Sequence, residues 1–99
     1  MQIAHEILKQ LGGNKFLAMT GAKNILALKE GVQFDLPRGA KNKANKVQIV
    51  LSPSDLYTVA FYKWNAGKLS MSLIDSVHGV YSDSLTTVFK HRTGLEVSL

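Results

Sequence analysis

The run from Pro37 to Lys46 concentrates more charge than any other part of the chain. It contains none of the seven acidic residues, although the whole chain has a net charge of +5. Basic side chains can neutralise phosphates, and asparagine amides can reach base edges. The residues of these two kinds in the run are Arg38, Lys41, Asn42, Lys43, Asn45 and Lys46. We expect a nucleic-acid-binding loop, for DNA or RNA; the alternative is a solvated loop whose charge only aids solubility.

Aromatic side chains alternate along the run that ends at Trp64, and alternation is typical of a strand. Tyr57 and Phe61 fall on one face, while Tyr62 and Trp64 fall on the other. Exposed rings beside a basic loop hold single-stranded nucleic acids by base stacking. We expect Tyr57 and Phe61 in the core and include Trp64 in the candidate nucleic-acid site. The alternative for Tyr62 and Trp64 is that they cover a strand end.

Residues suited to catalysis are present, but they form no recognisable motif. The three histidines lack the H-x-H and H-x-x-x-H spacings that bind metals. Asp75, His78 and Asp83 could supply acid–base partners, yet no nucleophile elbow accompanies the nearby Ser76 and Ser82. We expect structural positions for them, with Asp75 and Ser76 in a turn and Asp83 in the first turn of a helix. The sequence therefore predicts no catalytic residue, no metal site and no cofactor.

Two helices are expected, one near each end of the chain. The first ends at Gly12-Gly13 and has apolar residues at helical spacing: Ile3, Ile7, Leu8 and Leu11. The second is expected from about Val80 to Arg92, with an apolar stripe at Tyr81, Leu85, Val88 and Phe89. Gly94 follows as a left-handed cap, with Leu95 as its hydrophobic contact.

Apolar runs separated by turn residues fill the region between the helices. The runs cover residues 16–19, 25–28, 32–36, 47–51, 57–62 and 69–73. Those from residue 32 onward alternate with a period of two, which indicates half-buried strands. We predict an α+β fold, an antiparallel sheet of four to five strands flanked by an N-terminal and a C-terminal helix on one face. The basic run then becomes a long loop between two strands.

Length and composition favour a single compact domain covering residues 1–99. The chain is 45% hydrophobic and 19% charged, which is ordinary for a globular protein. It has no cysteine, so disulfides and thiolate metal sites are excluded. The N-terminus does not read as a signal peptide and no apolar run is long enough to span a membrane. We expect a cytoplasmic location and no membrane partner.

Several segments resemble small proteins encoded by bacteriophages and bacterial mobile elements. They are GGNKFLAMTGAKN (12–24), LPRGAKN (36–42), LSPSD (51–55), GVYSD (79–83) and TGL (93–95). The resemblance touches nearly the whole chain, but it transfers no functional residues, since these relatives have no assigned activity. It implies a bacterial or phage-infected host cell. It also implies a second class of function, binding of a host protein such as a defence factor.

Two hypotheses follow from these observations. A nucleic-acid-binding module would use the basic loop, assisted by Lys15, Lys23 and Lys63. A protein-interaction module would use a sheet edge or an exposed aromatic patch at Tyr62 and Trp64. Salt dependence separates the two, because only the first requires many phosphate contacts.

Overall fold

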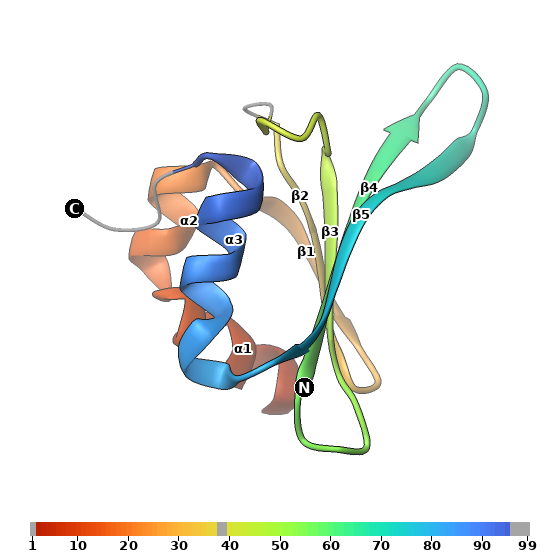
Figure 1. Ribbon diagram of the computed structural model, residues 1–99. Coiled ribbons are helices and arrows are strands. Elements are labelled where there is room, and N and C mark those ends of the chain that lie inside the picture. Colours follow the sequence, from red (N-terminus) through yellow and green to blue (C-terminus); the bar gives the residue numbers. More distant parts are fainter. Residues whose placement is uncertain (1, 38–39, 96–99) are drawn as a thin grey trace.

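The computed structural model describes residues 2–37 and 40–95 and has an α+β fold (Figure 1). Five strands form one antiparallel sheet, which confirms the predicted sheet of four to five strands, and their order is β1-β2-β3-β4-β5. The elements are α1 (Gln2–Leu11), α2 (Asn14–Thr20), β1 (Lys23–Leu28), β2 (Gly31–Asp35), β3 (Lys46–Leu51), β4 (Tyr57–Asn65), β5 (Ser70–Val80), the 3₁₀ turn η1 (Ser82–Ser84) and α3 (Leu85–Thr93).

All three helices lie against the same face of the sheet (Figure 1). Three fully buried rings join the helices to the sheet. The ring centroid of Phe16 in α2 lies 5.5 Å from that of Phe34 in β2 and 5.0 Å from that of Phe89 in α3, and both contacts are edge-to-face. Such pairs add to the free energy gained by burying their area. The prediction that the N-terminal and C-terminal helices cover one face is therefore confirmed. No described helix covers the other face, which we call the open face.

The alternating strands place their apolar residues as the sequence predicted. Tyr57 and Phe61 are buried beneath the helices, and so are the alternate positions of β2 and β3. Successive side chains of a strand point to opposite faces, so Tyr62 and Trp64 belong to the open face. The expectation of core positions for Tyr57 and Phe61 is confirmed.

The run from Phe16 to Met19, grouped above with the strand-like segments, lies instead in the helix α2. A four-residue apolar run does not distinguish a strand from a buried helix segment. The helix buries Phe16 in the core and ends at Thr20, whose hydroxyl donates to the Phe16 carbonyl oxygen at 2.7 Å. Gly21 follows in the left-handed conformation, with φ 70°.

The predicted C-terminal helix begins too early. Strand β5 continues to Val80 and α3 starts only at Leu85. Asp75 and Ser76 therefore lie in a strand and not in the expected turn, and His78 lies in the same strand. Tyr81 is 64% exposed and belongs to no apolar stripe. A register shift near Asp75 and the positive φ of Gly79 interrupt the alternation of β5, which is why the sequence did not show one long strand.

The β4–β5 hairpin extends beyond the rest of the sheet. Pairing of β3 with β4 reaches only Lys46 opposite Tyr62, whereas β4 and β5 stay paired up to Asn65 opposite Ser70. Residues 63–73 therefore form a projecting ribbon, which we call the hairpin arm (Figure 1). Its side chains are exposed.

Candidate nucleic-acid interface

The antiparallel topology collects basic residues at one end of the sheet. The β2–β3 loop, the β4–β5 turn and the starts of β1, β3 and β5 all lie at this end, which we call the basic end. The last turn of α3 joins them, because the backbone N–H of Lys41 donates to the Thr93 carbonyl oxygen at 2.6 Å. The described cations there are Lys23, Lys41, Lys43, Lys46, Lys63, Lys68, Lys90 and Arg92.

Acidic residues are distributed the other way. Among the described residues, only Asp35 and Asp75 belong to the basic half of the sheet, and each is held in an ion pair, with Lys46 and with Arg92 respectively. The carboxylates at the opposite end are Glu6, Glu30, Asp55 and Asp83. The described charges are thus polarised along the strands: cations gather at the basic end, whereas the four carboxylates of the opposite end are joined there by Lys29 of the β1–β2 turn.

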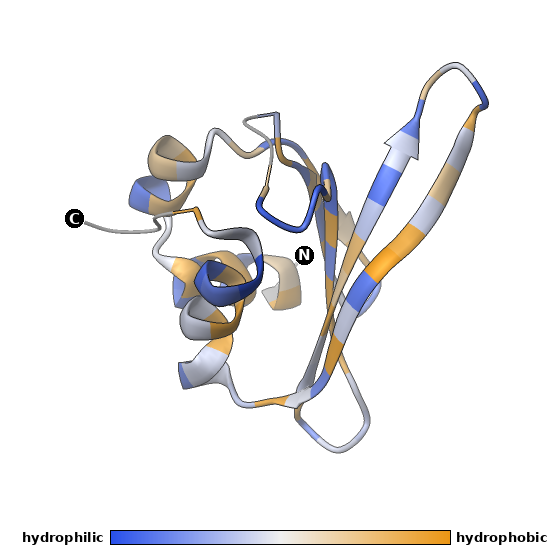
Figure 2. Cartoon of the chain, turned by 45° about the horizontal axis from the view of Figure 1, so that its top comes forward, coloured by the Kyte–Doolittle hydropathy of each residue, from blue (hydrophilic) through white to orange (hydrophobic). Residues whose placement is uncertain are grey.

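Figure 2 shows the hydrophilic β2–β3 loop beside the equally hydrophilic last turn of α3. Lys41 and Lys43 are exposed, and Lys43 has a positive φ of 68°. The side chain of Asn42 turns inward: its Oδ1 accepts from the Ala44 N–H at 3.1 Å, and its buried Nδ2 has no partner among the described residues. Of the expected loop site, Lys41 and Lys43 are presented to solvent. Arg38 lies outside the described residues.

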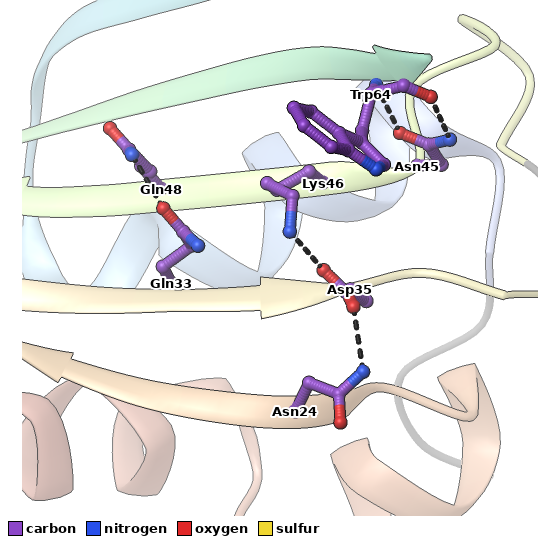
Figure 3. Close-up of polar contacts among 7 residues, drawn as sticks. All are labelled: Asn24, Gln33, Asp35, Asn45, Lys46, Gln48 and Trp64. Carbon is purple, nitrogen blue, oxygen red and sulfur yellow. Dashed lines mark hydrogen bonds and ion pairs between the residues drawn. The ribbon is translucent and has the colours of Figure 1, made fainter. Parts of the chain in front are cut away.

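Lys46 does not extend freely into solvent as a loop residue would. It is the first residue of β3, and its Nζ lies 2.6 Å from Asp35 Oδ1, while Asn24 Nδ2 donates to Asp35 Oδ2 at 2.8 Å (Figure 3). Partial burial raises the pKa of Asp35. The hydrogen bonds from Lys46 and Asn24, with the charges of Lys46 and Lys23, outweigh this effect and hold the pKa below its ordinary value of 3.8.

Asn45 is engaged with the protein backbone. Its Nδ2 donates to the Trp64 carbonyl oxygen at 3.1 Å, and its Oδ1 accepts from the Trp64 N–H at 2.7 Å (Figure 3). The side chain therefore imitates one more residue of a β-ladder. The sequence predicted that this amide would reach a base edge, but the structure uses it to position Trp64.

A pocket of about 190 Å³ opens where these residues meet. It lies at the basic end on the open face, and its walls are formed by Lys23, Asp35, Leu36, Pro37, Asn45, Lys46 and Trp64. The indole of Trp64 leans over β3 beside Lys46 and remains 39% exposed (Figure 3). Of the assisting lysines, Lys23 lines this pocket, Lys63 lies on the other side of β4, and Lys15 lies in α2.

Sequence reasoning missed Asn24 and Asp35, although a signal for Asp35 was present. Val32 and Phe34 fill the core positions of β2, so the alternation predicts that Gln33 and Asp35 share the opposite face. The partners of that face could not be read from sequence, because they depend on the register between strands.

The residues weighed for catalysis are not brought together. Arg92 binds both carboxylate oxygens of Asp75 at 2.9 Å, beneath the helices. His78 contacts Thr58 on the open face, and Asp83 lies in η1. No group of three or more metal-ligating side chains occurs within the described ranges 2–37 and 40–95.

Comparison of the chain with protein-family models, curated proteins and solved structures finds no match. Within the described part of the chain, no helix has both the length and the apolar character needed to cross a membrane. The case for function therefore depends on the geometry of the basic end and the open face.

Proposed function

We propose that this protein binds nucleic acid without catalysing a reaction, and that the basic end is the contact surface. The segregation of charge is the observation that carries the proposal. A field of one sign over one end of a molecule raises the local concentration of a polyanion and speeds its association. The ion pairs of Asp35 and Asp75 reduce the repulsion that carboxylates at this end would exert on phosphates.

Exposed lysines on different connections make the contact. Lys41 and Lys43 stand on the β2–β3 loop, Lys68 lies in the β4–β5 turn, and Lys23 begins β1. Each phosphate that they neutralise releases condensed counterions. The log of the association constant then falls against log salt with a slope of about −0.7 per contact for single strands and about −0.9 for duplex DNA.

The test removes two charges from the basic end and, separately, two from elsewhere. The double variant Lys41→Gln/Lys43→Asn keeps most side-chain volume, and asparagine tolerates the positive φ at position 43. Its matched control is Lys9→Gln/Lys29→Gln, which removes the same charge from α1 and from the β1–β2 turn. Binding to labelled single-stranded DNA, RNA and duplex DNA is measured by fluorescence anisotropy across a salt series.

We expect the magnitude of the single-strand salt slope to fall by about 1.4 in the loop variant, because two phosphate contacts of about 0.7 each are lost. The control variant should keep the slope of the wild type. An equal decrease of the salt slope in both double variants would mean that binding depends only on the net charge of the protein and not on the basic end. Wild-type protein that binds none of the three nucleic acids at low salt would refute the proposal.

A protein-interaction module is the second candidate function, and the hairpin arm favours it. The arm exposes Leu69, Met71 and Leu73, at 78%, 40% and 58%, and exposed apolar patches mark interaction sites. The resemblance to phage and mobile-element proteins makes a bacterial host protein the natural partner. In that case Leu73→Ser would abolish capture of the partner, and Lys41→Gln/Lys43→Asn would not.

A further inference from the structure

We propose that a single-stranded nucleic acid lies across the open face with bases stacked on Trp64 and Tyr62. This inference depends on the proposed function and specifies which nucleic acid is bound and where its bases lie. It draws on a surface separate from the basic loop, namely the uncovered side of β3, β4 and β5.

Two rings and two apolar side chains form a platform on this face. In the sheet register Trp64 is opposite Met71, and Tyr62 is opposite Leu73. Alternate residues of a strand lie about 7 Å apart on one face, so the two rings are neighbours, with Trp64 exposed and Tyr62 half-buried. Met71 and Leu73 are 40% and 58% exposed, so the platform is apolar and open to solvent at its β5 side.

The Trp64 backbone is held in place before any ligand arrives. The Asn45 amide binds both the N–H and the carbonyl oxygen of Trp64, by hydrogen bonds of 2.7 and 3.1 Å. The pocket beside the indole is lined by Lys23, Lys46 and the Asp35 that pairs with Lys46. These three side chains leave one net positive charge, so a base stacked there would bring its phosphate close to positive charge. Because the backbone is already ordered, stacking on Trp64 costs only the conformational entropy of its side chain.

Amide groups lie on the same face, on the two strands next to the rings, β3 and β2. Gln48 of β3 donates through Nε2 to Gln33 Oε1 of β2 at 2.7 Å (Figure 3). This bond leaves the Gln48 carbonyl and the Gln33 amino group available, one acceptor and one donor. Both could hydrogen-bond to the edge of an unpaired base.

Charge complementarity selects a polyanion over an apolar protein partner at this platform. The basic end borders the rings, through Lys23 and Lys46 on the open face and through the β2–β3 loop above it. A duplex hides the faces of its bases inside the stack, whereas a single strand offers them to exposed rings. The combination of basic groove and stacking rings therefore fits a single strand.

Trp64 is the only tryptophan of the chain, so its fluorescence reports on the proposed contact alone. We would titrate wild-type protein with a short single-stranded oligonucleotide, with its duplex and with heparin, a polyanion that has no bases. Stacking predicts strong quenching by the single strand, and binding of heparin without comparable quenching. It also predicts weaker binding of the duplex at the same salt.

Three variants locate the effect. Trp64→Ala should weaken single-strand binding roughly 5- to 100-fold, as for one stacked base, with the salt slope unchanged. Trp64→Phe keeps an aromatic ring and should therefore lose less single-strand affinity. The control is Tyr81→Ala, because Tyr81 is an exposed aromatic residue, at 64% against 39% for Trp64, and lies beyond the far end of β5. Circular dichroism checks that each variant folds.

The outcomes separate this inference from the function on which it depends. Unchanged single-strand affinity in Trp64→Ala, equal affinity for duplex and single strand, or equal quenching by heparin would each overturn the inference. Nucleic-acid binding through Lys41 and Lys43 would then still stand. If no nucleic acid binds and the hairpin arm captures a protein, both proposals are wrong.

Discussion

Asp35 shows how a single side chain links three strands at the edge of the candidate interface. Its carboxylate accepts from Lys46 of β3 and from Asn24 of β1 while it stands at the end of β2. The ion pair is half-buried, with side chains 17% and 25% exposed, so it is screened less than a surface pair. The same carboxylate partly neutralises Lys46 and so weakens its attraction to any phosphate.

Asp35→Asn should destabilise the fold by roughly 1 kcal/mol at neutral pH, the upper range for partly exposed pairs. The pKa of Asp35 is lower in the folded than in the unfolded protein, so its contribution is complete above pH 3.8. This contribution is lost as the pH falls through the folded-state value. Urea unfolding from neutral pH down to pH 2 should therefore show the difference between wild type and variant shrinking below pH 3.8. A difference that stays constant with pH would contradict this account.

The same substitution should strengthen binding of nucleic acid. Removing one negative charge beside Lys46 lowers the electrostatic cost of a nearby phosphate by about 1 kcal/mol, which is roughly fivefold in affinity at low salt. Anisotropy with labelled single-stranded DNA measures the gain. Partial unfolding cannot explain a variant that is less stable and yet binds more tightly. Weaker binding by the variant would mean that the phosphates do not lie near Lys46.

At the scale of elements, the junction between β3 and the hairpin arm matters most. Regular pairing of β3 ends at Lys46 opposite Tyr62, and the Asn45 N–H adds one bond, to the Tyr62 carbonyl oxygen at 2.9 Å. The Asn45 side chain then supplies the two bonds to Trp64. These bonds tie the base of the arm to the sheet.

Asn45→Ala should therefore loosen Trp64 without removing it. Two hydrogen bonds are lost, for an expected destabilisation of about 1–3 kcal/mol. Single-strand affinity should fall toward that of Trp64→Ala, and the fluorescence anisotropy of Trp64 should drop in the free protein. Asn45→Asp keeps the acceptor for the Trp64 N–H, but it turns an oxygen toward the Trp64 carbonyl in place of the donor and adds a negative charge. It is therefore compared through the fluorescence anisotropy of Trp64 in the free protein and not through affinity. An unchanged Trp64 signal in Asn45→Ala would show that the arm is held by its own pairing.

For the whole molecule, the two faces of the sheet have separate tasks. One face carries Phe34 into the buried contact with Phe16 and Phe89, which holds the helices. The other face carries Tyr62 and Trp64, and no described helix packs on it. Stability and recognition should then respond to different substitutions.

Phe89→Ala should cost about 3–5 kcal/mol of unfolding free energy, because it opens a cavity among three rings of the core. Phe89→Leu should cost less, since more volume is retained. Trp64→Ala, by contrast, should change stability by about 0.5 kcal/mol or less. Denaturant unfolding followed by far-ultraviolet circular dichroism measures all three. Comparable losses in Trp64→Ala and Phe89→Ala would mean that the open face supports the fold after all.

Local patterns sufficed wherever a strand alternates strictly or a helix ends in glycine. Val47 and Ile49 are buried as predicted, and Gly94 caps α3 in the left-handed conformation. The same patterns failed at Phe16, because its short apolar run fits the period of a helix as well as that of a strand. They also failed in β5, where a bulge breaks the alternation.

The amino-acid sequence by itself determined the α+β class, the buried faces of β2 to β4 and the concentration of basic residues between two strands, because periodicity and composition are local properties. Tertiary structure alone decided the partners of those residues. The register placed Asp35 against Lys46, and the loop path placed Asn45 against Trp64. The packing of α3 placed its basic last turn beside the β2–β3 loop, at the same end of the sheet. These contacts join residues far apart in the chain, and only the packing of the whole sheet sets their distances.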